Sequence, residues 1–371
     1  MVKRSSLWMV GIVTVVILIF AACATDATAQ EKPIKWRTQS TFGVGSWDFI
    51  HGERVVKRIE AISQGRLQLG PLLAPGTIVP AYEVLDAVNR GILEAGQGWS
   101  GYWVGKNSAF TLFSSATGGP FGMDAWDWAA WLLFGGGYDL WKELFESTGY
   151  TNVVPFMIKG ELPEPLGWFP KPIESFEDLK GLKMRVAGLA AEVFKEAGVA
   201  VVNVSGGEIL PLLERKTIDA TEYSDPHSDL LLGLPDVLKF YEMPGIHQPS
   251  GCTELLINKK KWEQLSQDLK DIVEVVCNEM TLKNNFEEWI YGQEALEKME
   301  KEYGVQVVRT PDEVLIKFLE AWDKVAAKEC ETNPMFKKIY ESQKAWASKY
   351  VPYRTRIYPP YSLIADYYWK K

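Results

Sequence analysis

Residues 212–229 read LLERKTIDATEYSDPHSD, which has the pattern of a helix end, a short strand and a polar strand exit. Charged residues close the helix at 212–216, and residues 218–221 are β-branched or small, as in a buried strand. This strand would deliver Glu222 and Tyr223 to its carboxyl end. Because ligands bind at the carboxyl ends of strands in open α/β sheets, the stretch predicts an α/β fold with Glu222 at a ligand site. A surface carboxylate at a strand exit is the alternative interpretation.

The same alternation of strands and helices occurs in two parts of the chain. Parallel strands joined by helices form layered α/β units with right-handed crossovers. Two such series, connected by crossing segments at 153–157 and 166–169, predict two similar lobes that form a clamp. The first series comprises strand 34–38, helix 47–62, strand 67–69, helix 82–89 and strand 93–95, and the second comprises strand 182–186, helix 190–196, strand 199–202, helix 207–214 and strand 218–221.

The remaining segments complete a two-lobed α/β fold. A strand at 254–258 would return the chain to the first lobe, and residues 269–302 have the pattern of one long helix. Thr310 is expected to cap a further helix with Pro311 in its first turn. The tail after Pro352 is dense in aromatic residues and needs a surface to cover. The expected boundaries are lobe I at 30–155 and about 255–280, lobe II at 156–254, and C-terminal helices at 281–371.

A targeting segment precedes the lobes. Lys3 and Arg4 are followed by the uncharged apolar run 7–22, which is the form of a secretory signal peptide. Cleavage after Ala29 would follow an A-x-A pattern, so residues 1–29 are the expected signal peptide. A lipoprotein signal that ends before Cys23 is the alternative and would tether the protein to a membrane. A permanent transmembrane anchor is disfavoured because the run is short for a span.

Composition and motifs argue against several function classes. The net charge is −8 and the sequence has no basic stripe that could bind phosphates, so no nucleic-acid partner is expected. The sequence at 96–101 matches G-x-G-x-x-G but lacks the following helix and acidic residue of a dinucleotide site. No catalytic motif accompanies the three histidines, so an enzyme is not expected. Cys252, Cys277 and Cys330 lack C-x-x-C spacing and allow one disulfide with one thiol left over.

Arg185 stands out as a candidate ligand-binding residue. It ends the apolar strand in KMRVAG (183–188), before a glycine turn, where a guanidinium could bind a carboxylate through two donors. A surface arginine is the alternative. Glu222 and Gln248 supply oxygen atoms in the same half of the chain. Oxygen ligands without Cys or clustered His suit Na⁺ or Ca²⁺ and not zinc.

Segments along the whole mature chain resemble the solute receptors of TRAP transporters. The most similar branch binds 2-oxo acids and lactate together with a metal ion. The resemblance implies the two-lobed clamp of periplasmic binding proteins. The segments that carry it are LDAV (85–88), PFGM (120–123), the Trp-rich stretch 126–141, KMRV (183–186), VNVSGGEI (202–209), IDATEY (218–223) and ELLINKK (254–260).

The resemblance implies a role for several residues. Arg185 matches the arginine that binds the ligand carboxylate, and Glu222 matches the metal-binding carboxylate. Tyr223 stands where the family usually has Trp, whose backbone carbonyl also faces the metal. Gln248 matches an oxygen ligand in a turn of the His-x-Pro-Gly type, here with Ser250 before Gly251.

Glu164 departs from the family pattern. Counting back from the Gly-Trp-Phe motif that contains Trp168 places Glu164 where the family has a ligand-binding Gln. A second carboxylate beside Glu222 would need a cation or a proton to compensate it, and added ligand charge favours Ca²⁺ over Na⁺. The alternatives are that Glu164 points elsewhere or hydrogen-bonds a hydroxyl of the substrate. The rings of Tyr102 and Trp168 are expected to shape the rest of the pocket, or else to belong to the core.

These features predict a periplasmic or surface-tethered receptor that binds a small 2-oxo or 2-hydroxy monocarboxylate and performs no chemistry. Its implied partner is a two-part TRAP membrane permease, and the aromatic tail resembles the part that joins subunits in dimeric members. Two alternatives belong to other classes. A receptor of an ABC importer would differ in its neighbouring genes, and an exported enzyme acting on hydroxy acids would show turnover.

Overall fold

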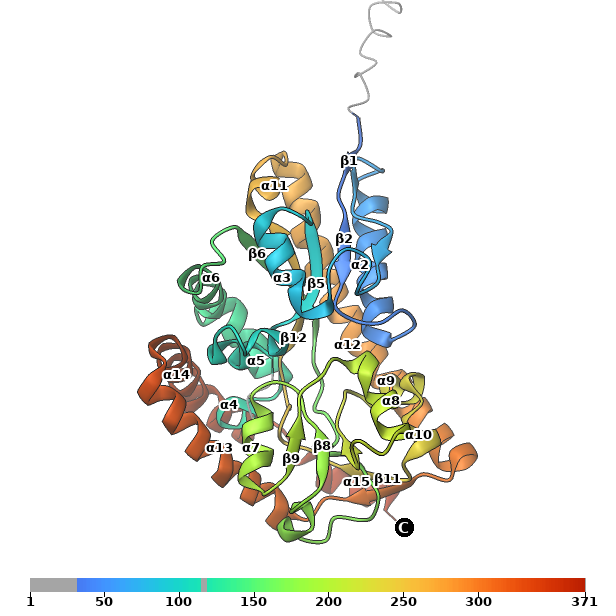
Figure 1. Ribbon diagram of the computed structural model, residues 1–371. Helices are drawn as coiled ribbons and strands as arrows, with labels where there is room; N and C mark the ends of the chain where they lie inside the picture. The colour runs from blue at the N-terminus through green and yellow to red at the C-terminus, as the bar shows by residue number, and fades with distance from the viewer. Residues whose placement is uncertain (1–31, 115–118, 371) are drawn as a thin grey trace, which may run out of the picture.

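The structure of the chain is a computed structural model that describes residues 32–114 and 119–370. The predicted signal peptide, both of its processing sites and Cys23 lie outside these residues. Within them, two sheets form the centres of two lobes (Figure 1). The predicted two-lobed α/β clamp is therefore confirmed.

Lobe I is built on a five-stranded sheet with the order β4-β2-β5-β12-β6. The first three strands run parallel, and β12 runs antiparallel to both β5 and β6. Two short strands, β1 (Ile34–Lys35) and β3 (Leu67–Gln68), pair separately. The elements of this lobe are β2 (Thr38–Ser40), α2 (Trp47–Ile62), β4 (Leu72–Leu73), α3 (Val84–Arg90), β5 (Ala95–Trp99), β6 (Val153–Gly160), β12 (Cys252–Asn258) and α11 (Lys259–Glu263).

Lobe II is built on a six-stranded sheet with the order β13-β11-β7-β10-β8-β9. Strands β10, β8 and β9 are parallel, as their helix connections require, and β7 runs antiparallel to β10 and β11. The edge strand β13 lies within the predicted C-terminal helical segment 281–371. The elements are β7 (Gly167–Phe169), β8 (Lys183–Arg185), α7 (Ala190–Glu196), β9 (Ala200–Val202), α8 (Ile209–Glu214), β10 (Ala220–Thr221), α9 (Pro226–Leu232), α10 (Leu234–Val237), β11 (Phe240–Met243) and β13 (Gln306–Arg309).

The lobes are joined by two crossings of the chain and by one helix. The chain leaves lobe I after β6, enters lobe II at β7, and returns through β12. Helix α12 (Gln267–Tyr303) has 37 residues, which corresponds to about 55 Å. It packs against β6 and α2 of lobe I and against α9 of lobe II (Figure 1). The cavity between the lobes therefore lies beside a continuous helical support.

Helix α13 (Asp312–Thr332) packs against α7 of lobe II, whereas helix α14 (Pro334–Ile357) returns to lobe I. Helix α14 packs against α13 and against α4, α5 and α6, where Phe113 stacks on Trp141 in an aromatic core. The last helix, α15, has no buried residue. In the part of the chain that the structure describes, no helix is long and apolar enough to cross a membrane. The bounds are α4 (Gly119–Gly122), α5 (Ala125–Phe134), α6 (Gly137–Ser147), α13 (Asp312–Thr332), α14 (Pro334–Ile357) and α15 (Tyr361–Trp369).

Two local predictions need correction. Helix α13 begins at Asp312 with Pro311 as its N-cap and has no side-chain cap bond, so Thr310, which is buried, does not cap it. The three cysteines of the described chain are free thiols, so the allowed disulfide does not form. The glycines at 96–101 serve packing, because a Cβ at Gly101 would lie 1.9 Å from the Trp99 ring. No helix of the dinucleotide-binding type follows that segment, only the 3-10 turn Ser100–Trp103.

Candidate functional site

A cavity lies between the lobes and receives side chains from both. The space within its walls that a water molecule could occupy is about 30 Å³, so the polar side chains around it lie close together. Lobe I contributes Phe42, Asp48, Trp99, Tyr102 and Glu161, whereas the crossing segment and lobe II contribute Glu164, Arg185, Ala187, Tyr223, Ser224 and Gln248.

The strand register of lobe II brings Arg185 and Glu222 together. Arg185 is the last residue of β8 and pairs with Thr221 of the parallel strand β10, so Glu222 follows directly beside it. The Arg185 Nη1 donates to Glu222 Oε1 at 2.9 Å and to the Glu222 carbonyl at 3.0 Å, and Nε donates to the Val204 carbonyl at 3.0 Å. These bonds fix the guanidinium before any ligand arrives.

The Arg185–Glu222 pair is almost completely buried, with side chains 2% and 1% exposed. Burial raises the pKa of Glu222, while Arg185 and the Ala187 N–H, which donates at 2.7 Å, oppose the rise. Burial alone would lower the pKa of Arg185, but Glu222 and the neighbouring tyrosines raise it. The Tyr223 ring lies 5.9 Å from the guanidinium. Each member of the pair therefore offsets part of the cost of burying the other.

The turn at 245–248 holds the amide of Gln248 against this pair. Gln248 Nε2 donates to Glu222 Oε2 at 2.9 Å, and the Glu164 N–H donates to the Gln248 carbonyl at 3.1 Å. Gly245 permits this close approach, because a Cβ there would lie 2.6 Å from the Glu164 carbonyl oxygen. The crossing segment and the turn are thereby fixed to each other and to β10.

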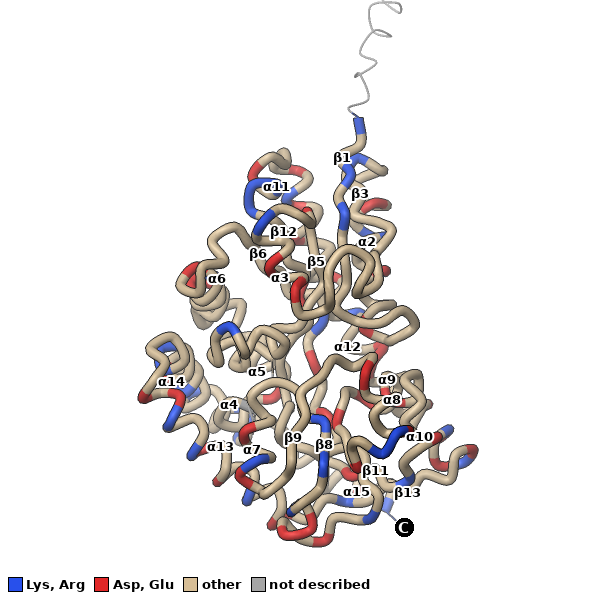
Figure 2. The backbone as a smooth tube through the Cα atoms, viewed as in Figure 1, with Lys and Arg blue, Asp and Glu red and all other residues tan. Residues whose placement is uncertain are grey.

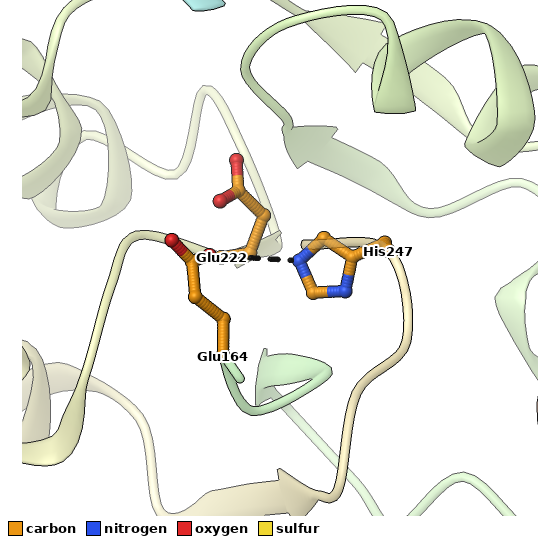
Figure 3. A group of neighbouring side chains, drawn as sticks. All are labelled: Glu164, Glu222 and His247. Atoms are coloured by element: carbon orange, nitrogen blue, oxygen red, sulfur yellow. Dashed lines mark ion pairs between the residues drawn. The ribbon is translucent and has the colours of Figure 1, made fainter. Parts of the chain in front are cut away.

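Three side chains at this point form a candidate metal site (Figure 3). Glu164, Glu222 and His247 each offer a ligand atom, and these atoms lie within 4.8 Å of one another. His247 Nε2 lies 3.7 Å from Glu164 Oε2, and burial lowers the pKa of His247 to about 3, so this imidazole is neutral. Burial, followed by repulsion from Glu222 and Glu161, raises the pKa of Glu164 well above its usual value.

Two oxygen atoms of this group fit a bound cation. Within residues 32–114 and 119–370, Glu164 Oε2 and Gln248 Oε1 are buried and accept no hydrogen bond. Buried acceptors without donors are rare and need an explanation. Carboxylate and amide oxygens are the ligands that hard cations such as Na⁺ and Ca²⁺ prefer.

The structure brings most of the predicted residues to one place. Arg185, Glu164, Tyr102, Tyr223 and Gln248 line the cavity, and Glu222 lies directly behind them. The residues that sequence reasoning missed on the wall are Phe42, Asp48, Trp99 and Glu161, and beside the wall His247.

Trp168 is the exception, because it lies in the core of lobe II and does not line the cavity. Its indole N–H donates to Asp229 Oδ2, and its ring stacks on Tyr241 at 4.1 Å. The alternative that its ring belongs to the core is the one that the packing supports.

Comparison with known proteins identifies the family. Residues 46–333 match the model of the bacterial extracellular solute-binding protein, family 7. A monocarboxylate 2-oxoacid-binding periplasmic protein of Nostoc sp. is 31% identical over 351 residues, which cover 93% of this chain and 94% of the relative.

Two solved structures show the same fold. A TRAP transporter solute binding protein of Bordetella bronchiseptica, a mixed-occupancy dimer with copurified calcium and picolinate, has a TM-score of 0.83 and 28% identity over 90% of this chain and 97% of its own. A TRAP periplasmic solute binding protein of Pseudoalteromonas atlantica, with bound sodium and pyruvate, has a TM-score of 0.81 and 28% identity over 88% of this chain and 97% of its own.

These matches confirm the family resemblance predicted from the sequence, and the expected absence of catalysis follows from membership of a family of binding proteins. Since the family model covers more than half of the residues, the chain belongs to the bacterial extracellular solute-binding proteins of family 7.

Proposed function

We propose that this protein is the solute receptor of a TRAP-type transporter and binds a small 2-oxo or 2-hydroxy monocarboxylate in the cavity between its lobes, together with a metal ion. The observation that carries the proposal is the convergence of Arg185 with the oxygens of Glu164, Glu222 and Gln248 in one buried site. The 2-oxoacid-binding relative and the pyruvate- and picolinate-bound structures support this class of ligand.

Arg185 binds the ligand carboxylate through Nη2. Its Nε and Nη1 already donate to Val204 and Glu222, whereas Nη2 has no partner among the described residues and the side chain lines the cavity. The two donors expected for the carboxylate are then the two N–H groups of this one nitrogen. Because the guanidinium is already ordered, binding loses little side-chain entropy.

The metal ligands are Glu222, Gln248, Glu164 and the backbone carbonyl of Tyr223. A bound cation supplies positive charge between the carboxylates and a contact for the 2-oxo or 2-hydroxy oxygen of the ligand. The second carboxylate, Glu164, favours Ca²⁺ over Na⁺. Three of the four ligands come from lobe II and its turn, so the site is assembled on one lobe and closed by the other.

When the two lobes close over the ligand, the loaded receptor can bind a TRAP membrane permease. The protein performs this role in the periplasm, either free after cleavage at Ala29 or tethered through Cys23.

We further propose that it is a homodimer joined through α14 and α15. The exposed apolar residues of this tail support a covering partner, and they are Tyr350, Tyr353, Ile357, Tyr358, Tyr361, Leu363, Ile364, Tyr367, Tyr368 and Trp369.

A thermal-unfolding panel tests the receptor function. Mature protein is heated with pyruvate, longer 2-oxo acids, lactate or aromatic acids, each with Ca²⁺, with Na⁺ or after chelation. A ligand at about a hundred times its Kd stabilises by about 2.7 kcal/mol. We expect stabilisation by 2-oxo acids that disappears on chelation. Stabilisation that is indifferent to metal would remove the assignments of Glu222, Tyr223 and Gln248, and turnover of a hydroxy acid would favour an enzyme instead.

A further inference from the structure

A second cavity lies beside the ligand cavity, and Tyr102 stands between them. Water could occupy about 350 Å³ of the second cavity, against about 30 Å³ of the ligand cavity. The other residues that line the second cavity are Tyr82, Gly101, Val104, Gly105, Lys106 and Asn203. Among the described residues, Tyr102 is the one that lines both cavities, so it is the wall between a small space and a large one.

The second cavity is bounded by both lobes. Tyr82 belongs to the 3-10 turn Ala81–Glu83 of lobe I, and Asn203 follows β9 of lobe II. The Tyr82 hydroxyl donates to Asn203 Oδ1 at 3.3 Å. The cation on this wall, Lys106, is paired with Asp86, and no carboxylate of the described chain lines the cavity. An uncharged chain could therefore enter this space without leaving a charged group there unpaired.

The ring of Tyr102 is packed from both sides. Trp99, from the ligand cavity, lies edge-on to it at 5.3 Å, and Tyr82, from the second cavity, lies edge-on at 4.9 Å. Phe42 adds a contact at 6.1 Å on the ligand side. A movement of the Tyr102 ring toward either space would have to displace one of these rings, so the wall is a fixed part of the site.

The hydroxyl end of Tyr102 reaches lobe II. Burial raises the pKa of Tyr102 to about 12, and Arg185 and the Gly206 N–H are close enough to the hydroxyl to oppose this rise. Both of these groups belong to lobe II, whereas the backbone of Tyr102 lies in the turn Ser100–Trp103 of lobe I. The side chain therefore spans the space between the lobes and closes the ligand cavity on this side.

A ligand cavity this small leaves room for a short chain only. The carboxylate of the proposed ligand lies at Arg185 and its 2-oxo or 2-hydroxy oxygen at the metal, so the rest of the chain has to fit within the same walls. Extra methylene groups in a closely packed site are expected to weaken binding about fivefold to a hundredfold. The large space that could receive them lies behind the Tyr102 ring.

Resting on the proposed function, we propose that Tyr102 is a specificity-determining residue that limits the chain length of the ligand. Its ring ends the ligand cavity, so pyruvate fits and unbranched 2-oxo acids with longer chains are excluded. Without the ring the two cavities join, and the end of a longer chain enters the second cavity.

Calorimetry with pyruvate and 2-oxohexanoate in saturating Ca²⁺ tests this proposal, because the two acids differ only in chain length. We expect the wild type to bind pyruvate at least about fivefold more tightly. Tyr102→Ala should shift the ratio of the two Kd values at least about tenfold toward 2-oxohexanoate, since each methylene group buried in the second cavity contributes about fourfold.

Three more variants complete the test. Tyr102→Leu removes the part of the side chain that reaches lobe II and should shift the ratio in the same direction, which keeps the test open if Tyr102→Ala does not fold. Tyr102→Phe keeps the ring and should keep the preference for pyruvate, whatever its absolute affinity. Val104→Ala is the matched control, because it widens the second cavity without opening the wall, so the ratio should not change.

Equal binding of the two acids by the wild type, or a ratio that Tyr102→Ala and Tyr102→Leu leave unchanged, would overturn the proposal while the receptor function stands. Loss of the preference in Tyr102→Phe would assign the discrimination to the hydroxyl and overturn the proposal too. If neither acid binds to the wild type, the proposed function fails and this inference fails with it.

Discussion

Removal of Arg185 tests the central feature of the site without any ligand. Arg185→Met would delete three donated hydrogen bonds and leave Glu222, 1% exposed, with the Ala187 N–H and the Gln248 amide as donors but without its cation. Breaking a buried ion pair by removing one member costs about 3–5 kcal/mol, because the remaining charge is uncompensated. We expect the free energy of unfolding of metal-free Arg185→Met to fall by that amount.

The partner substitution turns this measurement into a double-mutant cycle. Glu222→Gln alone leaves a buried guanidinium without its anion, and is expected to be destabilising too. In Arg185→Met/Glu222→Gln neither charge remains, so the double variant should be more stable than the sum of the single effects predicts, with a coupling energy of about 2–3 kcal/mol. Urea denaturation of chelator-treated protein provides the four free energies.

An exposed pair in the same lobe is the control. Lys195 and Glu192 on α7 are an i, i+3 pair with side chains 51% and 47% exposed. Their cycle, Lys195→Met with Glu192→Gln, should give a coupling below about 0.5 kcal/mol. If the coupling energy between Arg185 and Glu222 were also below about 0.5 kcal/mol, the two charges would not be buried together and compensating each other, and this interpretation of the pair would be wrong.

Three further outcomes are expected. Glu164→Gln should lower the ratio of Ca²⁺ to Na⁺ affinity at least about tenfold by calorimetry, because one ligand charge is lost, and an unchanged ratio would contradict its role as a metal ligand. Gly251→Ala, whose Cβ would lie 2.1 Å from the Ser114 carbonyl oxygen, should lower the free energy of unfolding by about 1–3 kcal/mol or more, whereas Gly207→Ala, with open space around it, should not. Burial raises the pKa of Glu254 to about 7 from its usual 4.5, so the folded state binds the proton of this carboxyl group more tightly than the unfolded state does. The free energy of unfolding should therefore fall, by on the order of 3 kcal/mol, as the pH rises from 4.5 to about 7. Glu254→Gln should therefore have a smaller fall in Tm between pH 5 and pH 8 than the wild type, and equal falls would show that the carboxyl group is not buried in solution.

The lobe II half of the site was predictable because it depends on local sequence. Arg185 and Glu222 follow adjacent parallel strands, and parallel strands place their carboxyl ends at one edge of the sheet, so the alternation of strands and helices was enough to bring them together. Gln248 was named from its amide oxygen in the same half of the chain, and the family resemblance gave it the role of a metal ligand. His247, its neighbour in the turn, was not singled out, because a single histidine has no spacing pattern that distinguishes a ligand from a core residue.

The lobe I half was not predictable in the same way. Asp48, Trp99 and Glu161 come from a helix, a strand end and the residue after β6, which are far apart in the sequence and meet only when the sheet of lobe I is assembled. Trp168 was assigned to the pocket from a motif, but its strand, β7, lies between β10 and β11, and its ring finds Asp229 and Tyr241 within lobe II. A motif gives the position of a residue in the chain, whereas the environment of its side chain depends on the strands beside it.

The charges around the cavity explain why an anion receptor should depend on a cation. Charged side chains of both signs are interspersed along the backbone, including the segments that meet between the lobes (Figure 2). Arg185 is already balanced by Glu222 and Asp48 by Lys159, so neither cation is free to balance a ligand. A carboxylate ligand entering this low-dielectric space adds a negative charge, and among the described residues that line the cavity the arginine donor left for it is Nη2 of Arg185. Side chains alone therefore give the ligand little net attraction, so affinity for the acid should require a bound cation and fall with its removal even though Arg185 remains in place.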